Sequence, residues 1–110
     1  MKDIEVLIIL EVKNLENKEI FEKHIKKEGF LVVEDENFVY AGTSSTTTFA
    51  TKAYILEVFK KALQKTNFLS CDMIFLLNET PYPAYVYDKT TNDFEEIKET
   101  PEKKNIKEKN

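Results

Sequence analysis

The fold is decided by Ile4–Lys13, "IEVLIILEVK", in which the residues at even positions share one character. Every even position from Ile4 to Val12 is apolar, which predicts a strand with one fully buried face. The odd positions are apolar only in the middle, at Leu7 and Ile9, and are charged at both ends. The second face of this strand is therefore expected to be only partly apolar.

The segments that follow alternate between helical and extended patterns. Asn17 is a preferred N-cap residue and Gly29 a preferred residue after a helix, so they delimit the first helix. The polar stretch 34–37 reads as the turn of a hairpin. The expected elements are a helix at 17–29, strands at 30–33 and 38–43, a helix at 51–67 and strands at 71–77 and 84–88.

This order of elements predicts an α+β protein with the ferredoxin-like βαββαβ arrangement. In that arrangement the antiparallel sheet has strand order 4-1-3-2, and both helices cover one face. Residues 84–88 would add an extra strand at an edge. Residues 1–88 are expected to form one domain, and the polar segment 89–110 is expected to be a disordered C-terminal tail.

The uncovered face of such a sheet would carry an apolar patch made of Leu7, Ile9, Ile74 and Leu76. Contiguous exposed apolar patches usually mark an interface. We therefore predict a homodimer that packs sheet against sheet about a two-fold axis. The alternative is that residues 84–97 of the same chain fold back over the patch.

Two carboxylates are expected at one end of the same open face. Glu11 ends the first strand and Asp72 begins the fourth, with the acidic turn at 34–36 at the same end. Paired carboxylates can hold a hard cation such as Mg²⁺, or act as acid and base. The alternative interpretation is that acids at strand ends are simply solvated.

The stretch 42–49, "GTSSTTTF", places six hydroxyl residues in a row before the second helix. Free N–H groups at the start of that helix, with the hydroxyls, could hold an anion. The ligand-binding candidates are Thr43, Ser44, Ser45 and Thr46. The stretch lacks the second glycine and the lysine of a phosphate loop, so the alternative is that a hydroxyl caps the helix.

The composition limits the classes of partner. The chain has 110 residues, a net charge of -4 and no arginine, so nucleic-acid binding is not expected from charge. The single cysteine, Cys71, favours a reducing compartment, and Asp3 and Glu5 interrupt the N-terminus before a secretory signal can form. The longest apolar run, Val6–Leu10, is too short to cross a bilayer. We therefore expect a cytoplasmic protein with no membrane segment.

The segments "LIILEV" (7–12) and "ENFVYAGTSS" (36–45) resemble those of small ferredoxin-like dimers among CRISPR-associated endonucleases and one class of antitoxin endoribonuclease. Those families place an aspartate at the end of the first strand, at the dimer axis, where this chain has a glutamate. The resemblance implies that Glu11 holds this position here.

Three functions are compatible with the sequence, and whether the chain is an enzyme is left open. The first is a homodimeric binding or regulatory protein, which acts on a protein partner or a small ligand without a cofactor. The alternative is a metal-dependent nuclease that uses Glu11 and Asp72 with Mg²⁺ at the dimer axis. The third is a sensor whose hydroxyl stretch binds an anion.

Overall fold

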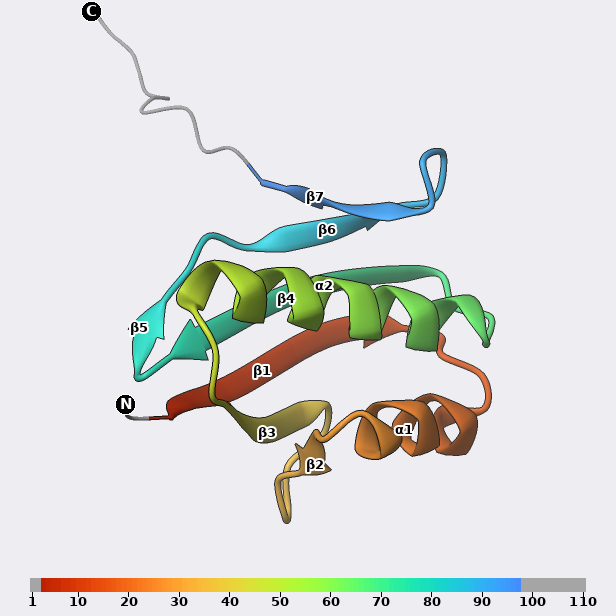
Figure 1. Ribbon diagram of the computed structural model, residues 1–110. Helices are drawn as coiled ribbons and strands as arrows, with labels where there is room; N and C mark the ends of the chain where they lie inside the picture. Colours follow the sequence, from red (N-terminus) through yellow and green to blue (C-terminus); the bar gives the residue numbers. More distant parts are fainter. Residues whose placement is uncertain (1–2, 98–110) are drawn as a thin grey trace, which may run out of the picture.

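A single antiparallel sheet carries both helices on one of its faces in the computed structural model, which describes residues 3–97 (Figure 1). The elements are β1 (Ile4–Lys13), α1 (Lys18–Lys27), β2 (Leu31–Val32), β3 (Val39–Ser44), α2 (Thr48–Gln64), β4 (Ser70–Leu77), β5 (Thr80–Pro81), β6 (Tyr85–Asp88) and β7 (Asp93–Glu96). The strand order is β2-β3-β1-β4-β6-β7, and β5 pairs with β4. The α+β class is confirmed.

The alternation in β1 determines which face of the sheet carries the core. Ile4, Val6, Ile8 and Leu10 are buried, whereas the odd positions are exposed or half-buried. Ile8 is paired with Tyr40 of β3, so Tyr40 lies on the same buried face.

Phe59 of α2 lies at the centre of an aromatic cluster on this buried face. Its ring centroid is 5.3 Å from that of Phe30, 5.7 Å from Tyr40 and 6.1 Å from Phe21. Phe21 belongs to α1 and Tyr40 to β3, so one side chain of α2 contacts both the other helix and the sheet. These contacts fix the two helices over β1 and β3.

The buried side of β4 follows the same rule. Cys71, Met73, Phe75 and Leu77 all point into the core. Burial raises the pKa of the Cys71 thiol to about 12, so the thiol stays protonated and unreactive at neutral pH. Cys71 therefore contributes packing, as a small apolar residue does.

Asn17 marks the start of α1, but its side chain makes no capping hydrogen bond. Its backbone is left-handed, with φ of 59°, and its carbonyl oxygen accepts from the N–H groups of Ile20 at 3.0 Å and Phe21 at 3.2 Å. Asparagine tolerates this conformation better than most residues, which explains its presence without a side-chain cap. Asn17 is therefore the N-cap residue, as predicted, but it lacks the side-chain hydrogen bond that usually explains this preference.

The C-terminal part of the described chain differs most from the sequence-based expectation. β6 is the strand expected at the edge, but β7 pairs with its outer side, with Tyr87 opposite Phe94. The domain boundary predicted at residue 88 therefore falls inside a hairpin, and residues 93–96 of the predicted tail form a strand. The remaining tail, 98–110, lies outside the described residues.

The β6–β7 hairpin also tests the prediction that the same chain covers the apolar patch. β6 pairs with β4 through Asp72↔Val86 and Met73↔Tyr85, so it extends the sheet sideways (Figure 1). The interpretation that residues 84–97 fold back over the open face is therefore wrong, because backbone pairing with β4 holds them in the plane of the sheet.

Candidate functional site

The face of the sheet opposite the helices, called the open face below, carries a ladder of cross-strand pairs between β1 and β4. The pairs on this face are Leu7↔Leu76, Ile9↔Ile74, Glu11↔Asp72 and Lys13↔Ser70. Ile9 is 39% exposed and Ile74 is 42% exposed, while Leu7 and Leu76 are half-buried. The four apolar side chains predicted to lie together are thus neighbours on one uncovered face.

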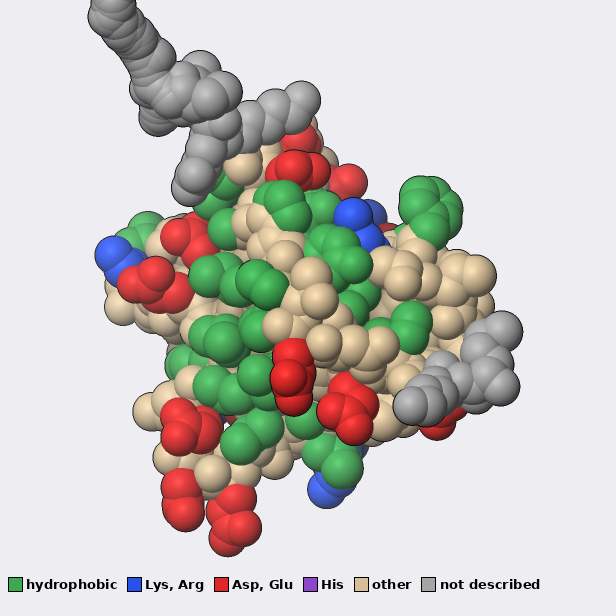
Figure 2. All heavy atoms as spheres, turned by 90° about the vertical axis from the view of Figure 1, so that its left-hand side faces the viewer, with side chains coloured by type: hydrophobic (Ala, Val, Ile, Leu, Met, Phe, Trp, Pro, Cys, Tyr) green, Lys and Arg blue, Asp and Glu red, His purple; other side chains and the backbone are tan. Residues whose placement is uncertain are grey.

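Adjacent strands widen this apolar patch. Ala41 of β3 lies opposite Leu7 and is paired in turn with the exposed Leu31 of β2, and Pro81 of β5 lies opposite Leu76. Figure 2 shows hydrophobic side chains in a band that runs up the molecule, from the β2 side to the β7 side. The patch therefore crosses several strands.

One end of the patch is hollowed. A depression of about 390 Å³ lies between β1, β3 and β4, and Leu7, Ala41 and Leu76 provide apolar walls. Glu5 and Glu79 line the same depression. This end of the open face can accept an apolar side chain from a partner, with carboxylates at its border.

The carboxylates Glu11 and Asp72 are direct cross-strand partners, one position beyond the Ile9↔Ile74 pair on the same face. Side chains at such positions have Cβ atoms about 5 Å apart, so the two carboxylates are within reach of one cation. Within residues 3–97, no cluster of three or more His, Cys, Asp or Glu side chains could hold a metal ion. One chain therefore places two neighbouring carboxylates at this position.

The hydroxyl stretch lies at the opposite end of the sheet and is occupied by its own hydrogen bonds. The Thr47 Oγ1 atom accepts from the Ala50 N–H at 3.1 Å and caps α2. Ser44 Oγ and Thr51 Oγ1 are 2.6 Å apart, and Thr51 Oγ1 donates to the Thr47 carbonyl at 2.7 Å. These hydrogen bonds are those of a helix start.

A hollow of about 360 Å³ beside the hydroxyl stretch includes Thr43, Ser44, Ser45 and Thr46 in its lining. The lining also contains Glu28, which accepts a hydrogen bond from the Tyr54 hydroxyl at 2.9 Å. A carboxylate at this position opposes anion binding. The geometry favours the capping interpretation of the stretch over the anion site.

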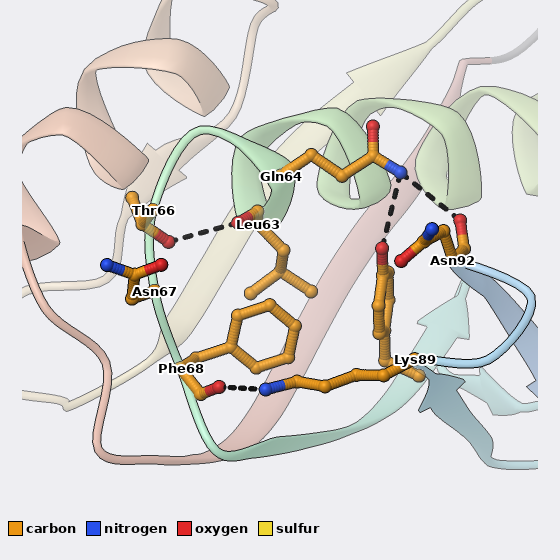
Figure 3. Close-up of a pocket in the computed structure, with 8 residues that line it drawn as sticks. Leu63, Gln64, Thr66, Asn67, Phe68, Lys89 and Asn92 are labelled. Carbon is orange, nitrogen blue, oxygen red and sulfur yellow. Dashed lines mark hydrogen bonds between the residues drawn. The ribbon is translucent and has the colours of Figure 1, made fainter.

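A third hollow, of about 590 Å³, lies at the C-terminal end of α2 and has no counterpart in the sequence-based predictions (Figure 3). The Gln64 amide donates to the Tyr87 hydroxyl and to the Asn92 carbonyl, both at 3.2 Å. The Lys89 ammonium donates to the Phe68 carbonyl and lies 4.4 Å from the centre of the Phe68 ring. These groups bind one another, so we interpret the hollow as the junction between the β6–β7 turn and the C-terminal end of α2.

No signal in the sequence could have indicated this junction, because its residues come from two separate stretches of the chain, 63–68 and 87–92. The open face differs in this respect. Its residues follow from the alternation in β1 and β4, which can be read directly from the sequence.

No helix in the described part of the chain is long and apolar enough to span a membrane. Comparison with protein-family models gives no match to this chain. Comparison with curated proteins and with solved structures gives no match either. The resemblance to small dimeric nucleases is therefore neither supported nor contradicted by known proteins.

Proposed function

We propose that the chain is a small ferredoxin-like homodimer that acts as a cytoplasmic binding or regulatory protein and associates through the open face of its sheet. The order β2-β3-β1-β4 around the first strand supports the ferredoxin-like assignment. The exposure of the paired Ile9 and Ile74 at the centre of a flat, uncovered face carries the proposal of association. The lone buried thiol of Cys71 is compatible with a reducing compartment.

A second copy of the chain is the occupant that this surface fits best. A two-fold axis packs the apolar patch of one chain against the identical patch of a second chain, so both patches are buried together. Hiding roughly 400 Å² of apolar surface in total would contribute about 10 kcal/mol, against an association cost of about 4–15 kcal/mol. We therefore expect a dimer of modest affinity, whose formation depends on every apolar side chain in the patch.

Replacing Ile74 by aspartate is expected to raise the Kd of the dimer by roughly thirtyfold, because the interface would then bury an unpaired carboxylate. Sedimentation equilibrium of the full chain over a range of concentrations measures this change. The matched control is Ile20→Asp in α1, where the isoleucine is similarly exposed at 46% but lies on the helix side. A Kd unchanged by Ile74→Asp, or raised equally by both substitutions, contradicts the proposed interface.

A metal-dependent nuclease is the second candidate, and the direct pairing of Glu11 with Asp72 favours it. In this case the two carboxylates would hold Mg²⁺, and the cation would stabilise negative charge that develops on a phosphodiester. Two protein carboxylates with water completing the shell is an ordinary way to bind Mg²⁺. The open face would then bring the carboxylates of two copies close to one axis.

Glu11→Gln is expected to reduce cleavage of RNA or DNA at least a hundredfold while the dimer is retained, if this second function is present. Gel assays with Mg²⁺ or Mn²⁺ measure cleavage, and sedimentation measures the dimer. Glu95→Gln, which neutralises an exposed carboxylate of β7, is the control and should leave cleavage unchanged. Wild-type protein that degrades neither nucleic acid with either metal excludes the nuclease.

A further inference from the structure

Charged side chains are divided unequally between the two layers of the molecule. Eight of the ten lysines among residues 3–97 lie in α1, in α2 or at the C-caps of these helices, and four glutamates lie there with them. These lysines are Lys18, Lys23, Lys26, Lys27, Lys52, Lys60, Lys61 and Lys65. The helix layer therefore has an excess of four positive charges.

The strands and their connections carry the opposite charge. Within residues 3–97 they contain thirteen carboxylates and only two lysines, Lys13 and Lys89. The carboxylates that share the open face by strand alternation and register are Glu5, Glu11, Asp72, Asp88, Asp93 and Glu95. Of these, Asp93 lies 3.8 Å from the Lys60 ammonium of α2. Figure 2 shows acidic side chains around the hydrophobic band. The open face is thus an apolar patch bordered by carboxylates. Lys13 is the one lysine that the described strands place on this face.

His24 reports the positive charge on the helix side. Its pKa is lowered by burial first and then by the charge of Lys65; Glu28 raises it, and Lys27 and Lys61 lower it by smaller amounts. These lysines lie on the helix side of the sheet, whereas Glu11 and Asp72 lie on the other side. The sheet separates these two sets of charges, so the three lysines do not neutralise Glu11 and Asp72; among the open-face carboxylates, Lys60 of α2 reaches only Asp93, at the β7 margin.

We infer that carboxylates on the open face oppose the sheet-to-sheet dimer, and that ionic strength therefore controls whether the dimer forms. This inference rests on the proposed function. In any two-fold packing of open face on open face, the carboxylates around the patch of one copy face those of the other copy. Like charges across an interface weaken association. Dissolved salt screens this repulsion, because the Debye length falls to about 10 Å at 0.1 M.

The sign of the salt effect distinguishes this arrangement from the other way in which two copies could meet. If the basic helix layer of one copy packed on the acidic open face of the next, salt would screen an attraction and loosen the complex. Face-to-face packing gives the opposite response. The dimer is therefore expected to tighten roughly fivefold in Kd between 20 mM and 300 mM NaCl.

The test is sedimentation equilibrium of the full chain at both salt concentrations, for wild type and for two charge-matched double variants. Glu11→Gln with Asp72→Asn removes two negative charges from the open face and should tighten the dimer roughly fivefold at 20 mM NaCl. The same variant should also respond less to salt. Glu19→Gln with Glu57→Gln removes two negative charges from the helix layer and should change the Kd less than about twofold.

Each outcome bears on a separate statement. A wild-type dimer that loosens with salt, or two double variants that tighten equally, overturns the inference and leaves the dimer intact. A wild-type chain that is monomeric at both salt concentrations contradicts the dimer itself. Chloride is used because sulfate would also strengthen the burial of apolar groups and mimic the expected result.

Discussion

Phe59→Ala is expected to lower the free energy of unfolding by about 4 kcal/mol, the largest single effect that we predict. Phe59 is fully buried, and its ring contacts aromatic rings from α1, from β3 and from the segment before β2. Its removal leaves a cavity that Phe21, Phe30 and Tyr40 cannot fill, since each is anchored in its own element. Small domains have total stabilities of about 5–15 kcal/mol, so the variant would be close to unfolding.

Urea denaturation followed by circular dichroism measures this loss. The same helix provides a matched control, because Phe49 is 81% exposed and near the start of α2. Phe49→Ala is expected to change stability by less than about 0.5 kcal/mol. Similar losses for the two substitutions would mean that the aromatic cluster around Phe59 does not hold the layers together.

Phe94→Ala is expected to cost about 3 kcal/mol, because Phe94 anchors β7 to the rest of the sheet. Phe94 is 7% exposed, and its ring packs edge-on against Tyr87 at 5.4 Å between centroids. The flanking residues of β7 are exposed acids, which contribute little burial of their own. Without Phe94, the strand would keep its backbone hydrogen bonds to β6 but lose its contact with the core.

Hydrogen exchange locates this loss as well as measuring it. Amides of β6 and β7 should exchange faster in Phe94→Ala, while protection of β1 and β4 should fall less, if the hairpin opens as a unit. Glu95→Ala, one residue along on the opposite face, should leave both stability and exchange nearly unchanged. A Phe94→Ala protein as stable as wild type would place β7 outside the cooperative fold.

The contrast between β1 and β7 shows what the sequence can predict. In β1, every even position from Ile4 to Val12 is apolar, which indicates the strand, its buried face and the residues on its open face. In β7, Phe94 is a single apolar residue among acids, and a single residue cannot show the periodicity that identifies a strand. The strand forms because Tyr87 offers a partner surface, a tertiary contact that local patterning does not encode.

The same distinction applies to the candidate sites. The pairing of Glu11 with Asp72 follows from alternation in two neighbouring strands, so the sequence indicates it once the strand order is assumed. The choice of Thr47 as the cap of α2 depends on backbone geometry, since six other hydroxyl residues lie within four positions of it. The left-handed backbone of Asn17 is equally invisible to a pattern of apolar residues.

The two lateral margins of the described sheet are poor templates for the addition of further strands. On one side the sheet ends in β2, which has only two residues, and on the other in β7, where three of four residues are acidic. A very short strand offers little template for another backbone, and repeated like charges discourage strands from adding side by side. Growth into ribbons by strand addition is thereby hindered at both margins, and any pairing of copies is left to broad surfaces, where it can stop at two.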